Sequence, residues 1–387
     1  MTLIADSAAL RALCDRLSKA EFVTVDTEFM RDRTYWPGLC LVQVAGPDEA
    51  WCIDPLAPDI DLTPLFDLMR NQAVLKVFHA ARQDLEIFYR AMGDFPRPLF
   101  DTQIAAMVCG FGESVGYETL ATKLAKARID KSMRFTDWAR RPLTERQLQY
   151  ALADVTYLRM VYEKLRRRLE KTDRAHWLHE EMDALVDPEK YSFDPEQAWL
   201  RLKPRTKSPR FLAILKEVAA WREREAQTKD MPRQRVLKDE AILEIAAHAP
   251  TGIDELTHVR AISRSTAEGR LGREILDAIA RGKAVPEAEA PTMEARREIP
   301  PGVGPAIDLL RVLLKMRCEE HDVAQKMVAS MEDLEQIAMD DTANVPALAG
   351  WRRLVFGEDA LKLKRGQLAL ALSGDGGVKA LDLTAQG

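Results

Sequence analysis

Short segments rich in β-branched and aromatic residues alternate with amphipathic segments in the first half of the chain, a pattern typical of an α/β domain. Short connections between the first three predicted strands favour an antiparallel meander, and the strand and helices that follow extend it into a mixed sheet flanked by helices. Ser7 and Thr144 stand at predicted helix N-caps. The predicted strands are Phe22–Phe29, Leu39–Ala45, Ala50–Asp54 and Leu75–His79, and the predicted helices are Ser7–Lys19, Leu62–Met69, Ala81–Met92, one within 98–111, Tyr117–Leu124 and one that begins after Thr144.

Around Tyr191–Pro209 the pattern of the first domain breaks, and amphipathic helical segments follow. Three prolines between 195 and 209 interrupt the periodicity, so we place a domain boundary there. The last amphipathic segment, Leu361–Leu372, is predicted to be helical, and the glycine-containing tail after it to be disordered. The sequence therefore predicts an α/β domain at 1–200, two small all-α domains at 207–283 and 302–373, a Pro/Glu/Ala-rich linker at 284–301 and a disordered tail at 374–387.

Composition is that of an ordinary globular protein, with 387 residues, 47% hydrophobic residues, 30% charged residues and a net charge of −5. No apolar run reaches the roughly 18 residues of a membrane-spanning helix, and no N-terminal secretory signal is visible, so no membrane partner is expected. Five cysteines are scattered without C-x-x-C spacing. This arrangement argues against a zinc site or a disulfide framework and favours a cytoplasmic protein.

The net charge does not indicate nucleic-acid binding, so any such binding has to rest on local clusters of cations. From Arg201 to Lys238 the chain has 12 Lys/Arg and 4 Asp/Glu, which gives a local charge of +8. Such a cluster can follow a phosphate backbone, and it can equally form the solvated face of a helix. The loop that contains Trp138, Arg140 and Arg141 leaves the same two interpretations open.

Two acidic residues, Asp26 and Glu28, stand near the end of the first predicted strand. Because they are two residues apart in a strand, both side chains point to the same face. A buried carboxylate needs a partner, a proton or a metal ion, since burying it unpaired is strongly unfavourable. Two like charges on one face do not stabilise a fold, but they form a good cation site. The D-x-E pattern alone is unspecific.

Further candidate residues lie in two separate segments. Asp84 comes in the first turns after the strand Leu75–His79, at the usual edge of an α/β active-site crevice. It equally fits a solvated acid that the dipole of the following helix favours. Tyr150 and Asp154 are four residues apart and share one face of the long helix. Taken alone, this pair could be a surface hydrogen bond.

Together these residues predict a metal centre. Carboxylate oxygens prefer hard cations such as Mg²⁺ or Mn²⁺. Four carboxylates can hold two such ions roughly 3.5–4 Å apart, where they stabilise the attacking and leaving oxygens of a phosphoryl displacement. Tyr150 would orient or deprotonate the attacking water. No Gly-rich phosphate loop follows the first strand, which disfavours a nucleotide cofactor.

The same segments, in the same order, resemble the DEDDy-type 3′–5′ exonucleases and, among them, the ribonuclease D family. They read D-T-E-F, H-A-x-x-x-D-L and Y-A-x-x-D, and the run D-K-S…T-D-W…R-P-L-T-x-x-Q precedes the last of them. The resemblance covers about residues 1–200 and implies a ribonuclease H-like fold. It implies that Asp26, Glu28, Asp84 and Asp154 are the metal ligands and that Tyr150 positions the attacking water.

A second resemblance concerns the predicted helical domains. The string W-R-E-R-E-A…P-R-Q-R-V-L-K-D-E-A-I-L-E-I-A, within 207–283, is similar to the HRDC domain, which implies accessory nucleic-acid binding. Segment 302–373 matches the second, more divergent HRDC-like copy of the family in length and position, and we expect it to serve in packing.

The sequence therefore predicts a metal-dependent 3′–5′ exoribonuclease that acts on RNA with a single-stranded 3′ end. The resemblance implies that tRNA precursors and other small structured RNAs are its substrates and that nucleoside 5′-monophosphates are its products. Two alternatives remain at this point. One is a DNA 3′–5′ exonuclease of the same superfamily, and the other is a non-catalytic RNA-binding protein with the same fold.

Overall fold

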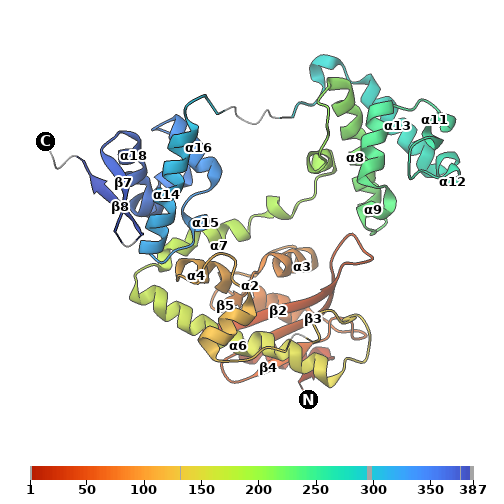
Figure 1. The fold of residues 1–387 in the computed structure, drawn as a ribbon. Helices are drawn as coiled ribbons and strands as arrows, with labels where there is room; N and C mark the ends of the chain where they lie inside the picture. Colours follow the sequence, from red (N-terminus) through yellow and green to blue (C-terminus); the bar gives the residue numbers. More distant parts are fainter. Residues whose placement is uncertain (1, 131, 294–298, 375, 384–387) are drawn as a thin grey trace.

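A mixed sheet forms the centre of the N-terminal part of the molecule, here called the sheet domain (Figure 1). The computed structural model describes residues 2–130, 132–293, 299–374 and 376–383. The strands of this sheet are β1 (Leu3–Ile4), β2 (Phe22–Met30), β3 (Gly38–Ala45), β4 (Ala50–Ile53), β5 (Leu75–Phe78) and β6 (Leu99–Asp101). Their order is β1-β4-β3-β2-β5-β6. The predicted antiparallel meander of β2, β3 and β4 is confirmed, and β5 and β6 extend it in parallel.

Three helices cover one face of this sheet, where Val23 and Val25 of β2 share an apolar core with residues of each helix. The helices are α1 (Ser7–Leu17), α2 (Thr63–Arg70) and α3 (Arg82–Met92). The N-cap of α1 is Asp6, whose carboxylate accepts a hydrogen bond from the Ala9 amide at 2.8 Å. The prediction of Ser7 is wrong by one residue, because Asp and Ser cap helices equally well and the sequence pattern does not distinguish neighbours.

One long helix, α6 (Glu145–Lys171), covers the other face. It begins at the predicted N-cap Thr144, which forms a capping box. The Thr24 hydroxyl of β2 donates a hydrogen bond to the Val155 carbonyl of α6 at 2.8 Å. Because alternate side chains of a strand share a face, the two acids of β2 also face α6. Shorter helices complete the domain: α4 (Thr102–Val108), α5 (Tyr117–Leu120) and α7 (His179–Leu185).

Helices α8 to α13 form a second unit, the middle domain, with an apolar core of its own. They are α8 (Pro209–Thr228), α9 (Arg233–Val236), α10 (Asp239–His248), α11 (Ile253–Thr257), α12 (Arg264–Glu268) and α13 (Arg270–Ala284). A Cβ atom on Gly282 of α13 would lie 2.6 Å from the Ile214 Cα of α8, so only glycine allows these helices to pack this closely. Among all described helices, none is long and apolar enough to cross a membrane.

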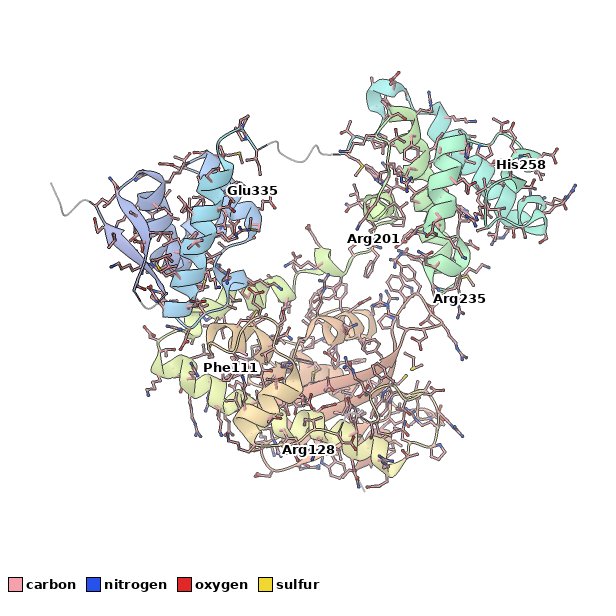
Figure 2. The ribbon with its side chains drawn as sticks, viewed as in Figure 1. Phe111, Arg128, Arg201, Arg235, His258 and Glu335 are labelled. Atoms are coloured by element: carbon pink, nitrogen blue, oxygen red, sulfur yellow. The ribbon has the colours of Figure 1, made fainter. Side chains whose placement is uncertain are left out.

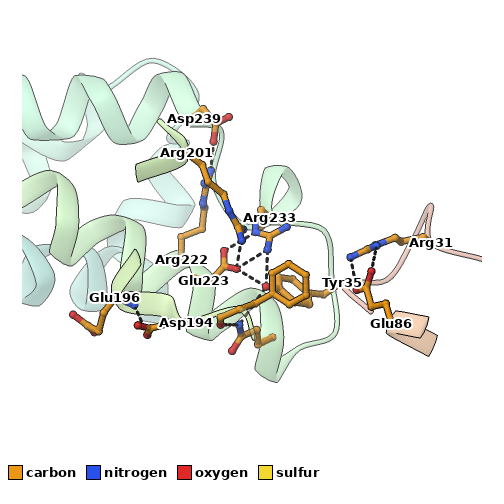
Figure 3. Close-up of polar contacts among 12 residues, drawn as sticks. Arg31, Tyr35, Glu86, Asp194, Glu196, Arg201, Arg222, Glu223, Arg233 and Asp239 are labelled. Carbon is orange, nitrogen blue, oxygen red and sulfur yellow. Dashed lines mark hydrogen bonds and ion pairs between the residues drawn. The ribbon is translucent and has the colours of Figure 1, made fainter. Parts of the chain in front are cut away.

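The loop between β2 and β3 holds the middle domain through a polar cluster, here called the clasp (Figure 3). Tyr35 of the loop is 3% exposed, and its hydroxyl donates a hydrogen bond to Glu223. The same hydroxyl accepts hydrogen bonds from Gln227 at 3.2 Å and from Arg233 at 2.6 Å. Asp230 accepts a hydrogen bond from the Tyr35 backbone N–H at 3.1 Å. The clasp therefore consists of these five residues, one from the sheet domain and four from the middle domain.

Glu223 is the central charge of the clasp, with only 1% of its surface exposed. Burial favours the neutral acid, but hydrogen bonds from Arg233 and Tyr35 and the charges of Arg233 and Arg201 hold the pKa of Glu223 below its usual value. Arg233 forms the closest ion pair, at 2.6 Å. Since the clasp loop continues directly from β2, the middle domain is fixed to the strand that carries Asp26.

The C-terminal domain packs directly on the sheet domain, because Phe22 of β2 and Leu310 of α14 belong to one continuous apolar core. The rings of Trp177 and Trp351 stack across the contact at 4.1 Å between centroids. Arg352, 5% exposed, forms ion pairs with two glutamates of α7. The helices of the C-terminal domain are α14 (Gly304–Glu320), α15 (Gln325–Val328), α16 (Met331–Met339), α17 (Gly350–Arg352) and α18 (Glu358–Lys364).

The C-terminal hairpin corrects two predictions. β7 (Leu368–Leu372) and β8 (Val378–Asp382) pair in an antiparallel ladder, so the predicted helix at Leu361–Leu372 ends with α18 and the predicted disorder is wrong for β8. Gly366 ends the helix with φ near 70°, and Gly376 takes φ near 86° in the turn. The glycines thus mark turns that flank strands. Residues 375 and 384–387 of the predicted tail, and 294–298 of the predicted linker, lie outside the described residues.

Removing the central charge of the clasp should destabilise the protein. In Glu223→Gln, Arg233 loses the carboxylate that neutralises it, and we expect the free energy of unfolding to fall by about 3 kcal/mol. Thermal denaturation measures the change, and faster proteolysis of the segment 203–208 would show that the middle domain is released. Glu217→Gln, on the same helix, is the matched control, because its ion pair with Arg281 is partly exposed and should contribute about 0–1 kcal/mol. Equal losses in the two variants would contradict the role of the clasp.

Candidate active site

β2 and α6 bring three of the predicted acids together. Asp26 and Glu28 project from β2 toward α6, and Asp154 projects from α6. One carboxylate oxygen from each residue lies within 4.8 Å of the other two, and all three side chains are half-buried. The alternation of side chains along β2 and the position of α6 across it therefore produce a compact acidic cluster.

Asp84 lies beside this cluster. It sits in the first turn of α3, is 6% exposed and accepts a hydrogen bond from the Thr27 hydroxyl at 2.5 Å. Burial and then the charge of Asp26 raise the pKa of Asp84 well above its usual value. Asp84 is thus not the solvated acid of the alternative interpretation. Its carboxylate oxygens are, however, not among those that lie within 4.8 Å of one another.

The cluster is electrostatically unfavourable when all of its acids are ionised. Burial raises the pKa of Asp26 to about 6. Burial, followed by the charges of the neighbouring acids, raises the pKa of Glu28 to about 10. Burial and the charge of Asp26 raise the pKa of Asp154 well above its usual value. Carboxylates this close together take up protons unless a cation compensates their charge.

Tyr150 lies one helical turn before Asp154, and its phenol lowers the pKa of that acid against the larger effect of burial. Burial and the charges of Asp154, Glu28 and Asp26 raise the pKa of Tyr150 above its usual value. Its phenol is therefore neutral at physiological pH. The predicted face-sharing of Tyr150 and Asp154 on one helix is what the structure shows.

Asp26, Tyr150 and Asp154 line a cavity of about 410 Å³, a volume suitable for a small organic group. Arg134 lines the same cavity and lowers the pKa of Glu28 and Tyr150 through its charge. Sequence reasoning missed Arg134, because only its position within the D-K-S…T-D-W run, and no residue pattern of its own, associates it with the acids. Lys131 of that run lies outside the described residues.

The loop beside the cavity bears on the two interpretations that the sequence leaves open for Trp138. Trp138 is 2% exposed and packs against Tyr150 at 6.0 Å between ring centroids, so it cannot meet a nucleic-acid backbone. Phe135 is instead 91% exposed, and the Arg134 guanidinium lies 5.3 Å from the centroid of its ring. An exposed aromatic ring beside a cation is typical of a base-stacking position.

The donor set fits hard divalent cations, since every group of the cluster offers carboxylate oxygens. His79 also lines the cavity, but its Nδ1 lies 3.0 Å from the Thr102 hydroxyl, and burial lowers the pKa of the ring. It was not predicted as a ligand and is not part of the acidic cluster. The residues that could hold an ion are therefore Asp26, Glu28 and Asp154, with Asp84 adjacent to them.

The basic segment 201–238 is less available to a partner than its composition suggests. Five of its cations form ion pairs with acids of the same chain: Arg201, Lys216, Arg222, Arg224 and Arg233. Arg235 is exposed on α9, the helix that also carries Arg233 of the clasp (Figure 2), and Arg201 is exposed as well and pairs with Glu223 of the clasp. The exposed remainder includes Lys203, Arg205, Lys207 and Lys238.

Comparison with known proteins gives this site a family. Residues 1–170 match the family model described as 3′–5′ exonuclease, and residues 211–279 match the HRDC domain model. The chain is 52% identical over 374 residues to ribonuclease D of Granulibacter bethesdensis, which covers 96% of this chain and 95% of that protein. It is 53% identical over 370 residues to ribonuclease D of a Jannaschia species, which covers 94% and 95% of the two chains.

A solved structure agrees with these matches. The crystal structure of Escherichia coli RNase D, described as an exoribonuclease involved in structured RNA processing, superposes with a TM-score of 0.80 at 30% identity and covers 94% of this chain and 98% of that one. The fold and site thus define a 3′–5′ exonuclease with an HRDC domain. The chain belongs to the ribonuclease D family and is a 3′–5′ exoribonuclease, which sets aside the DNA exonuclease and the non-catalytic alternatives.

The raised carboxyl pKa values predict how stability depends on pH. The folded protein without metal keeps protons on Asp26 and Glu28 that the unfolded chain releases at lower pH, so its melting temperature should fall by several degrees as pH rises from about 5 to about 8. Mg²⁺ should raise the melting temperature more at the higher pH, because it replaces those protons. Asp26→Asn should flatten both trends. An equal effect of Mg²⁺ at the two pH values would contradict the assignment.

Proposed function

We propose that this exoribonuclease shortens tRNA precursors and other small structured RNAs from a single-stranded 3′ end, at a site that holds two Mg²⁺ or Mn²⁺ ions. The observation that carries the proposal is that carboxylate oxygens of Asp26, Glu28 and Asp154 lie within 4.8 Å of one another, at a cavity that Asp26 and Asp154 line. The description of the Escherichia coli relative as acting in structured RNA processing supports the substrate class. The products would be nucleoside 5′-monophosphates.

Each candidate residue has a separate task in this proposal. Asp26, Glu28, Asp84 and Asp154 would hold the ions. Divalent cations at such a site stabilise the attacking and leaving oxygens of the phosphodiester. Tyr150 is neutral, so its hydroxyl would orient the attacking water by hydrogen bonding and would not remove its proton. Tyr150 and Asp154 both line the cavity, which places that hydroxyl beside the acids.

The RNA would reach the acids past the exposed side of the cavity. Arg134 lines the cavity and offers a guanidinium to a phosphate next to the scissile bond. Phe135, 91% exposed and next to it, offers a ring on which a base of the incoming strand can stack. Exposed cations of the middle domain, such as Arg235, would contact phosphates farther along the RNA.

A tRNA with a 3′ extension tests the proposed function directly. In the presence of Mg²⁺ or Mn²⁺ we expect stepwise shortening from the 3′ end, and no cleavage after EDTA treatment. Asp26→Asn and Asp154→Asn should each lower the rate by more than about 100-fold while the fold is retained, because a loss of 10–100-fold is typical even of residues that only surround metal ligands.

The control for these variants is Asp15→Asn, an exposed acid of α1 that is outside the cluster and should leave the rate unchanged. Internal cuts in the tRNA would contradict an exonuclease mode of action. Full activity of either active-site variant would contradict the metal-site assignment.

Phe135→Ala tests the proposed route of the RNA. Loss of a stacked base weakens binding by about 1–3 kcal/mol, so KM for a single-stranded RNA should rise about tenfold with little change in kcat. Phe135→Tyr keeps an aromatic ring of similar size and should keep the KM of the original protein. Steady-state kinetics with one RNA oligonucleotide gives KM and kcat for the original protein and for both variants. A lower kcat with unchanged KM in Phe135→Ala would contradict the stacking role.

A further inference from the structure

Gln43 of β3 is a buried polar side chain whose hydrogen bonds are missing. Its side chain is 0% exposed. Neither its Oε1 nor its Nε2 has a hydrogen-bond partner among the described residues. Buried amide groups are almost always paired in folded proteins, because an unpaired one loses its hydrogen bonds to water without replacement. An unpaired carboxamide at this depth therefore indicates a partner that becomes available in another state of the site.

The sheet register places Gln43 next to the acidic cluster. In the antiparallel ladder, Gln43 is directly opposite Asp26 of β2 on one side and directly opposite Cys52 of β4 on the other. Directly opposed residues of antiparallel strands point to the same face, with Cβ atoms about 4.5–5.5 Å apart. This is the face that α6 covers, as the hydrogen bond from Thr24 to the Val155 carbonyl shows. The carboxamide thus lies under α6, beside Asp26.

Packing alone does not explain an amide at this position. Its neighbour across the sheet, Cys52, belongs to an apolar cluster with Ala151 of α6 and Leu41 of β3. Thr24, the polar residue on the same face of β2, already bonds to the Val155 and Ala45 carbonyls. An apolar side chain of the same length would fill this space without an unpaired group. The group beside Gln43 that gains from a donor is the carboxylate of Asp26.

We propose that Gln43 is a positioning residue for Asp26, in which Nε2 donates a hydrogen bond to the Asp26 carboxylate when a divalent cation is bound. An ionised carboxylate has more than one oxygen to satisfy, and a donor on one of them fixes the direction in which the other faces the ion. Hydrogen bonds of this kind around metal ligands change metal affinity by about 10–100-fold. The inference rests on the metal site of the proposed function.

Gln43→Met separates this role from a packing role, since methionine keeps the length of the side chain and removes both polar atoms. We expect the dissociation constant for Mn²⁺, measured by isothermal titration calorimetry on the full chain without RNA, to rise about 10–100-fold. The melting temperature of the metal-free protein should be unchanged or higher, because the variant no longer buries an unpaired amide. Gln43→Leu should change the Mn²⁺ affinity in the same direction.

The matched control is Val44→Ala, the next residue of β3, whose side chain packs in the core on the opposite face. It should lower the melting temperature and leave the Mn²⁺ dissociation constant within about twofold, since it makes a cavity between Val25 and Trp51 and not beside the acids. The inference is overturned if Gln43→Met binds Mn²⁺ as the original protein does, or if its affinity falls no more than that of Val44→Ala. An original protein that binds no Mn²⁺ would overturn the proposed function itself.

Discussion

The arrangement of the whole active site depends on one electrostatic constraint, the meeting of like-charged carboxyl groups where β2 passes under α6. Burial and mutual repulsion raise the pKa values of Asp26, Glu28 and Asp154, so the cluster opposes its own assembly when no cation is present. The apolar packing on both faces of the sheet supplies the free energy that holds these groups together. Stability of the fold and affinity for a cation are therefore linked properties of this protein.

The residues of the site were predictable where local geometry decides their direction. Asp26 and Glu28 share a face because a strand has a period of two, and Tyr150 and Asp154 share a face because a helix brings residues four apart together. The burial of Asp84 was not predictable, because it depends on Thr27 of another segment. Sequence alone left open whether Trp138 contacts RNA or lies in a solvated loop, whereas tertiary packing buries it and leaves Phe135 of the same loop exposed.

The fold was predictable to a similar degree. The central meander follows from long alternating segments and short connections, whereas β1 and β6 are too short to show a pattern. The hairpin of β7 and β8 was missed because apolar residues spaced along a short segment fit a helix as well as a strand, and because glycines occur both in turns and in disordered tails. Net charge counted from sequence also overestimated the basic surface, since Arg222 and Arg233 are paired with acids.

The shared core between the sheet domain and the C-terminal domain changes how the chain should be divided. Phe22, near the start, and Phe356, near the end, lie in one apolar core, so segments far apart in sequence fold as one cooperative body. The middle domain is then an insertion whose two ends both return to that body. The clasp holds the middle domain against the sheet domain through Tyr35, Glu223 and Arg233. The middle domain is consequently the part of the chain that could be deleted or exchanged as a module, whereas the C-terminal domain is not.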